Sequence, residues 1–90
     1  MTTTVTRRAH DYELTVDGVR AGHLSFVEDA GTVVLTHTVV DDAVAGQGLA
    51  GTLTREVLDD LRARGLAVVP QCPFVAAWIG KHPDYADLVR

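Results

Sequence analysis

Residues 32–65 read TVVLTHTVVDDAVAGQGLAGTLTREVLDDLRARG, and this stretch decides the fold because its hydrophobic period changes halfway. The β-branched side chains of its first nine residues predict a well-buried strand over residues 32–40. Apolar residues then recur every four positions, at Leu49, Leu53, Val57 and Leu61. That spacing predicts an amphipathic helix over residues 48–64, with Gly65 as its stop. A glycine-rich segment therefore joins a strand to a helix.

The flanking sequence extends this unit in both directions. Before it, apolar and polar residues alternate over residues 10–16 and 19–27, which predicts two strands joined by a tight turn. In the second of them, the alternation puts Val19, Ala21, His23 and Ser25 on one face and Arg20, Leu24 and Phe26 on the other. After the helix, residues 66–69 form a short apolar run typical of an interior strand. Residues 73–82 read as a second helix, with a proline in its first turn.

The predicted order is β-β-β-α-β-α, which belongs to the α/β (α+β) class. It implies a mixed, mostly antiparallel sheet of about four to five strands with two main helices packed on it. A chain of 90 residues suits one domain over residues 1–90. The Thr-rich residues 1–8 are expected to be a flexible tail.

Composition excludes several classes of function. A net charge of −4 without a basic stripe argues against nucleic acid and against a membrane-surface helix. No apolar run reaches the roughly 18 residues of a membrane span, and the N-terminus lacks the apolar region of a secretory signal. The single cysteine forms no internal disulfide, which fits a cytoplasmic location. The four histidines show no metal-ligand spacing, so no metal is expected.

The glycine-rich segment, residues 45–51, has features of a phosphate-binding loop, because glycines admit a ligand closely and the following helix N-terminus favours anions. It matches G-x-G-x-x-G, but the dinucleotide fingerprint also needs an acidic residue after the next strand, where Val69, Pro70 and Gln71 stand. It also matches the spacing of a P-loop, but Leu53 follows Thr52 where that motif needs Lys and then Ser or Thr. A turn that only starts a helix is the other alternative.

A third pattern fits better. The segment resembles the acetyl-CoA loop of the GNAT superfamily of N-acetyltransferases, Gln/Arg-x-x-Gly-x-Gly/Ala, with Gly48 and Ala50 in the Gly-x-Gly/Ala part. Ala45 stands where the family usually has Gln or Arg. Together with the later runs GLAVVPQCPFVAAWI and KHPDY, the chain resembles the short stand-alone (YjdJ-like) branch of that superfamily from residue 10 onward. The resemblance implies a minimal GNAT fold in a bacterial, cytoplasmic protein.

The resemblance also implies a cosubstrate and a set of contacts. Acetyl-CoA or coenzyme A is the expected small-molecule partner, with the loop on its pyrophosphate and the preceding strand beside its pantetheine arm. The cofactor-binding residues implied are Thr38, Val39, Val40, Ala45, Gly46, Gln47, Gly48, Leu49, Ala50, Gly51, Cys72 and Phe74.

Two residues are candidates for catalysis. Cys72 precedes Pro73 at the expected start of the second helix, where a helix N-terminus lowers a thiol pKa, and the short branch places a cysteine here near the acyl thioester. A small buried hydrophobe is the alternative. His37 is a candidate general base or a half-buried sheet histidine. Relatives often carry a Glu where this chain has Val39, which cannot accept a proton, so either His37, a water or Asp41/Asp42 takes that role or the chain does not catalyse the usual transfer.

The function implied is an acyltransferase that moves an acetyl group from acetyl-CoA to an amine. The missing Gln/Arg and Glu motivate an alternative, a non-catalytic module that binds or senses acyl-CoA. A purely structural interaction domain is a third possibility.

Overall fold

The computed structural model describes residues 1–44 and 46–90, so of the predicted cofactor residues Ala45 alone lies outside it. Its elements, in chain order, are β1 (Thr3–Arg7), β2 (Asp11–Val16), β3 (Val19–Asp29), β4 (Thr32–Val40), the 3₁₀ turn η1 (Asp42–Val44), α1 (Leu49–Ala63), β5 (Ala67–Pro70), α2 (Pro73–Lys81) and the 3₁₀ turn η2 (Pro83–Leu88).

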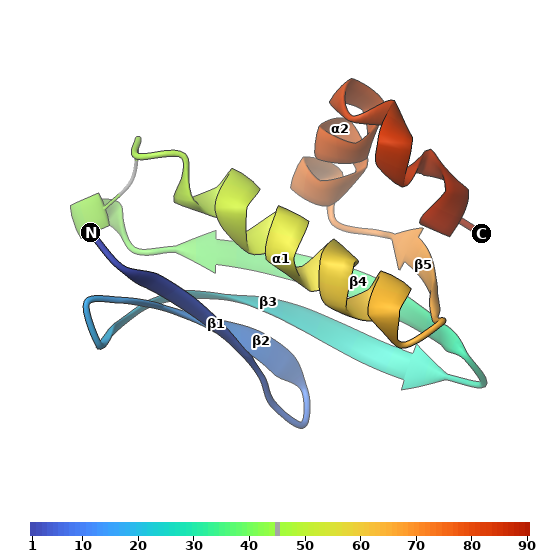
Figure 1. Ribbon diagram of the computed structural model, residues 1–90, viewed down its shortest axis with the longest axis horizontal. Helices are drawn as coiled ribbons and strands as arrows, with labels where there is room; N and C mark the ends of the chain where they lie inside the picture. The colour runs from blue at the N-terminus through green and yellow to red at the C-terminus, as the bar shows by residue number, and fades with distance from the viewer. Residues whose placement is uncertain (45) are drawn as a thin grey trace.

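The five strands form one sheet in the order β1-β2-β3-β4-β5 (Figure 1). Neighbours among the first four are antiparallel, and β5 lies parallel to β4. The parallel pair requires a crossover, which α1 provides. The mixed, mostly antiparallel sheet with two main helices confirms the predicted fold class.

The prediction of a flexible tail is wrong. Thr3–Arg7 forms the edge strand β1, paired with β2 from Thr3↔Val16 to Arg7↔Tyr12. Val5 packs against the core and the guanidinium of Arg7 lies 5.2 Å from the centre of the Phe26 ring. Threonine is polar, which made the segment resemble a tail, but its β-branched side chain suits an edge strand. The observed order is therefore β-β-β-β-α-β-α.

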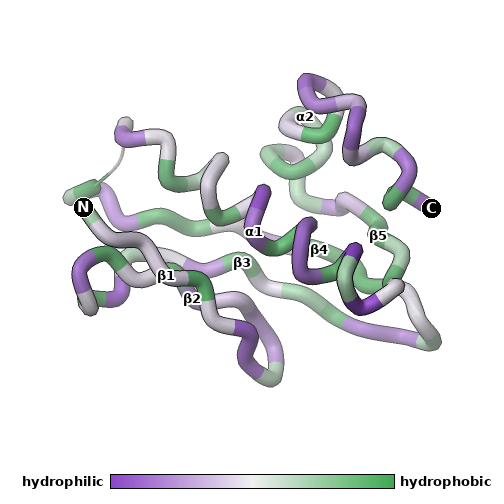
Figure 2. Tube along the Cα trace, in the orientation of Figure 1, coloured by the Kyte–Doolittle hydropathy of each residue, from purple (hydrophilic) through white to green (hydrophobic). Residues whose placement is uncertain are grey.

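One hydrophobic core fills the space between the sheet and the helices. The apolar residues that recur every four positions along the predicted helix are all buried in this core, together with Leu58. They are Leu49, Leu53, Val57 and Leu61. From α2 the core takes Val75, Trp78 and Ile79, so both helices cover the same face of the sheet. Figure 2 shows the resulting alternation of apolar and polar residues along α1. Among the described helices, none is long and apolar enough to cross a membrane.

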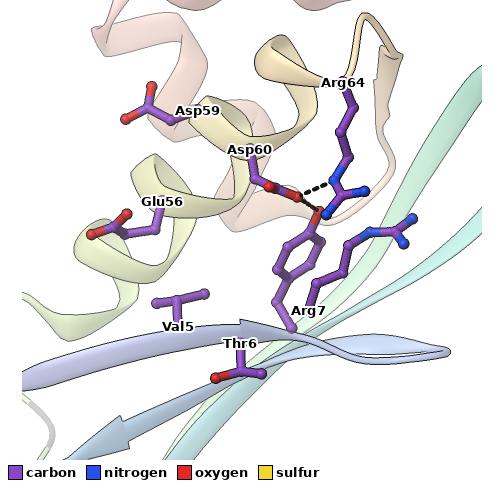
Figure 3. A pocket seen from close by; sticks show the side chains of 8 residues that line it. Val5, Thr6, Arg7, Glu56, Asp59, Asp60 and Arg64 are labelled. Carbon is purple, nitrogen blue, oxygen red and sulfur yellow. Dashed lines mark hydrogen bonds and ion pairs between the residues drawn. The ribbon is translucent and has the colours of Figure 1, made fainter.

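Tyr12 ties the sheet to the last turns of α1. Its hydroxyl donates a 2.5 Å hydrogen bond to Asp60, which also accepts one from Arg64 at 2.7 Å (Figure 3). Burial and the bond to Asp60 raise the pKa of Tyr12 to about 12. Burial also raises the pKa of Asp60, but the bonds from Tyr12 and Arg64 outweigh it and lower that pKa below its ordinary value.

A bulge separates the two halves of β3. Leu14 pairs with Gly22 and Thr15 pairs with Arg20, which leaves Ala21 without a partner. The extra residue reverses the alternation, so Ala21 is buried in the core. The predicted placement of Ala21 on the face of His23 and Ser25, opposite Leu24 and Phe26, is wrong for this reason. Beside the bulge, a Cβ on Gly22 would lie 2.4 Å from the carbonyl oxygen of Val39, so β3 and β4 need glycine there.

Replacing Gly22 with alanine should lower the free energy of unfolding by roughly 2 kcal/mol or more, because a methyl group would force two paired strands apart. Urea denaturation of Gly22→Ala and wild type measures the difference. The control is Gly80→Ala in α2, where an added Cβ meets nothing within 4 Å. Equal stability of Gly22→Ala and Gly80→Ala would contradict the close approach.

Candidate functional site

The sheet opens between β4 and β5. Their pairing begins at Thr32↔Ala67 and stops at Leu35↔Pro70, whereas β4 continues along β3 to Val40. Proline has no N–H to continue the ladder, and the chain turns away after it. The N–H of Cys72 then donates to the carbonyl of Leu35 at 2.8 Å, which closes the narrow end of the opening.

A bulge in β4 decides which side chains face this opening. Ser25 pairs with His37 and Phe26 pairs with Leu35, so Thr36 is the extra residue. Leu35 before the bulge points into the core. After it, the even-numbered residues face the helices. His37 and Val39 lie on the opposite face, where Val39 is 49% exposed.

Cys72 and Thr38 meet at the narrow end. Cys72 is the N-cap residue of α2, as the sequence predicts, and is 5% exposed. Its Sγ lies 3.4 Å from Oγ1 of Thr38. Burial raises the pKa of the Cys72 thiol. The hydrogen bond with the Thr38 hydroxyl, helped by backbone N–H groups of Val75, Phe74 and Thr38, outweighs burial and leaves that pKa below its ordinary value. The thiol of Cys72 is therefore more acidic than that of an ordinary cysteine.

The loop before α1 presents backbone N–H groups. Gly46 and Gly48 have φ angles of 85° and 72°, the left-handed region that favours glycine. The first hydrogen bond of the helix runs from the N–H of Thr52 to the carbonyl of Gly48. The three N–H groups before Thr52 thus lack a partner inside the helix. No acidic side chain stands in this first turn, so its positive dipole end is not neutralised there.

These residues line a pocket of about 310 Å³. Its lining consists of Val40, Val44, Gly46, Gly48, Leu49, Ala50, Gly51 and Phe74. Val40 and Phe74 each lie two residues beyond a member of the Thr38–Cys72 pair. The same two segments, the end of β4 and the start of α2, therefore flank both the pair and the pocket.

Not every predicted site residue belongs to this arrangement. Gln47 is exposed and does not line the pocket. His37 is exposed on the far face, and the side chain of Val39 is there too. Phe74, by contrast, does line the pocket and is 42% exposed. Val44 in η1 lines the pocket although sequence reasoning did not single it out, because nothing local distinguishes it from another loop valine.

A second cavity, of about 530 Å³, lies at the other end of α1 against β1 (Figure 3). Its lining consists of Val5, Thr6, Arg7, Tyr12, Glu56, Asp59, Asp60 and Arg64. Three carboxylates against two guanidiniums give it a negative balance, which disfavours a phosphate-bearing ligand. Among residues 1–44 and 46–90, no group of three or more His, Cys, Asp or Glu side chains could hold a metal ion.

Comparison with known proteins identifies the class. The sequence model of a family described as GCN5-related N-acetyl-transferase matches residues 11–88. The chain therefore belongs to the GCN5-related N-acetyltransferase (GNAT) family. A comparison with curated proteins finds no match. The family confirms the resemblance seen in the sequence, while membership of the short stand-alone branch stays a prediction.

Solved structures agree with this assignment. An NMR structure of a GCN5-like protein from Staphylococcus aureus superposes with a TM-score of 0.75 at 19% identity, covering 97% of this chain and 87% of that one, and shows the shared fold. A GNAT-family N-acetyltransferase from Escherichia coli, solved with CoA, is 35% identical over 64% of this chain, with a TM-score of 0.57. A GNAT-family acetyltransferase from Brucella melitensis, solved with acetyl-CoA, is 25% identical over 76%, with a TM-score of 0.58.

These two relatives are longer proteins. The present chain spans 37% of the Escherichia coli protein and 50% of the Brucella melitensis protein.

The Thr38 hydroxyl should control the reactivity of Cys72. Thr38→Val removes a hydrogen bond that favours the thiolate, so the pKa of Cys72 should rise and alkylation by iodoacetamide should need a higher pH. The rate of alkylation measured against pH gives the midpoint of each variant. Thr36→Val is the control, because its hydroxyl donates to the carbonyl of Ser25. Identical midpoints in wild type and Thr38→Val would contradict the assignment.

Proposed function

We propose that this chain binds acetyl-CoA and transfers the acetyl group to an amine. The observation that carries the proposal is the loop at residues 46–51, where left-handed glycines and unpaired helix N–H groups border a pocket in a member of the GNAT family. An anion is the ligand that such a helix start favours. The relatives solved with CoA and acetyl-CoA support the same cosubstrate.

The cosubstrate would run from the loop into the opening of the sheet. Its pyrophosphate accepts hydrogen bonds from the N–H groups of Leu49 to Gly51, with Gly46, Gln47 and Gly48 beside it. The pantetheine arm follows Val39 and Val40 between β4 and Phe74, past the apolar wall of the pocket. The thioester then reaches the narrow end, where backbone N–H groups of β4 near residues 37–40 can polarise its carbonyl.

The acceptor would approach from the face of the sheet that carries no helix. Its nitrogen attacks the thioester carbon, the new C–N bond forms, and the C–S bond breaks to release CoA thiolate. The proton lost by the amine goes to His37, which is exposed on that face, or to water. Val39, the residue two positions further on the same face, has no group that can take it.

Cys72 offers a second route to the same product. Its thiolate attacks the thioester, an acyl-cysteine forms as CoA thiolate leaves, and the amine then attacks that acyl group and regenerates the thiol. The lowered pKa of Cys72 and its position beside Thr38 support this route.

Binding of acyl-CoA without transfer is the second candidate function. The observation that favours it is Val39, an exposed aliphatic side chain where many relatives carry a carboxylate. In that case the loop and pocket would act as above, and no amine would be acetylated.

Gly48→Glu should abolish CoA binding, because a carboxylate at the N-cap would repel the pyrophosphate. Isothermal titration with CoA measures the effect, and we expect the Kd to rise at least tenfold. Glutamate is also strained at the φ of 72°. Gly48→Asn is therefore the control, since asparagine tolerates that conformation without a charge and should retain most of the affinity. Unchanged binding by Gly48→Glu would remove the loop from the proposal.

Incubation with acetyl-CoA should separate the two routes and the two functions. Intact-mass spectra should show an acetyl adduct on wild type and none on Cys72→Ala if Cys72 carries the acyl group. Release of CoA thiol over a panel of amines reports transfer by either route. Transfer without an adduct rejects the cysteine route alone. Tight CoA binding without thiol release on any amine supports the binding module over the enzyme.

A further inference from the structure

The seam between α1 and α2 carries polar groups that the pocket does not use. Arg55 lies four residues, one helical turn, beyond Gly51 and thus on the same face of α1. Its guanidinium sits 5.2 Å from the centre of the Trp78 ring and 5.7 Å from that of Tyr85. Contact with these two rings restricts the Arg55 side chain, so its guanidinium stays close to the loop.

Arg55 forms no direct ion pair with a carboxylate of the described residues, and Asp59 lies on the far side of the Tyr85 hydroxyl. None of the ion pairs formed within the described part of the chain includes it. It donates one hydrogen bond, from Nη1 to the Tyr85 hydroxyl at 3.3 Å, while that hydroxyl donates to Asp59 at 2.7 Å. A guanidinium has five N–H donors, so most of them remain available to a ligand.

The indole N–H of Trp78 is a second hydrogen-bond donor in the seam between α1 and α2. Trp78 is 9% exposed, and its indole Nε1 has no hydrogen-bond partner among residues 1–44 and 46–90. A Cβ placed on Gly51 would lie 3.4 Å from that nitrogen, so the indole N–H faces the first turn of α1. Because residue 51 is glycine, no side chain covers the N–H. The indole nitrogen is not among the buried side-chain atoms of the described residues that lack a partner, so solvent reaches this N–H and a ligand can accept from it.

We propose that Arg55 and the indole N–H of Trp78 form a second phosphate subsite, which receives the 3′-phosphate of coenzyme A. This inference rests on the proposed function, because it takes the pyrophosphate to lie on the loop. From there the ribose phosphate has to reach only one helical turn along the seam, about 5 Å. A guanidinium fork and a neutral N–H together match the oxygens of a phosphate dianion.

A structural role alone would give a different result. Arg55 could serve only to hold α1 against η2 through its hydrogen bond to Tyr85. In that case, replacing Arg55 would weaken the binding of CoA and of 3′-dephospho-CoA by the same factor, or would leave both unchanged. A phosphate subsite instead makes the loss depend on the presence of the 3′-phosphate. Comparison of CoA with 3′-dephospho-CoA therefore separates the two roles.

Titration calorimetry at low ionic strength, where exposed charges are least screened, provides the test. Wild type should bind CoA about tenfold more tightly than 3′-dephospho-CoA. In Arg55→Gln the ratio of the two Kd values should fall to about one, with dephospho-CoA binding unchanged. Arg55→Lys, which keeps the charge without the fork, should give an intermediate ratio. Arg20→Gln removes an exposed charge from β3 and should keep the wild-type ratio.

Two results would overturn the inference. One is a wild type that binds CoA and dephospho-CoA equally, which leaves the proposed function intact. The other is an Arg55→Gln variant that keeps the tenfold ratio. If wild type binds neither compound, the proposed function itself fails, and the subsite fails with it. Circular dichroism melting of the exposed Arg55 variants confirms that each is folded.

Discussion

The limited pairing of β4 with β5 is the constraint on which the site depends. The ladder ends at Pro70, which cannot donate a hydrogen bond, and the chain leaves the sheet to start α2. The bond from the Cys72 N–H to the Leu35 carbonyl fixes the point where the two strands part. The rest of β4 therefore has β3 on one side only. Without that opening, the loop before α1 would border a closed sheet and no ligand could pass inward.

Two bulges then distribute side chains around the opening. The one in β3 turns Ala21 into the core, and the one in β4 brings Thr38 to Cys72 while it sends His37 and Val39 to the other face. Each inserts a single residue, and each thereby reverses the side-chain alternation of everything that follows in the strand. The result separates a thiol and the pocket on one side of β4 from an imidazole on the other.

The glycines of the loop reduce the stability of the start of α1 and keep the site accessible. Glycine at a helix start provides no side-chain cap, and an N-cap glycine stabilises a helix by roughly a few tenths of a kcal/mol less than serine or aspartate. In return the first-turn N–H groups stay open. Gly51 extends this pattern by leaving the indole of Trp78 uncovered. The aromatic packing around Arg55 shows that a basic group is held one turn away.

The sequence by itself determined the strand-to-helix switch at residues 32–65, the buried stripe of α1 and the N-cap position of Cys72. These follow from periodicity and from local motifs, which need no partner. Only the tertiary structure decided that residues 3–7 pair as a strand, that Ala21 is buried, that His37 lies apart from Cys72, and that Trp78 faces Gly51. Such outcomes depend on register and on contacts between distant segments, because one extra residue in a strand changes every face after it.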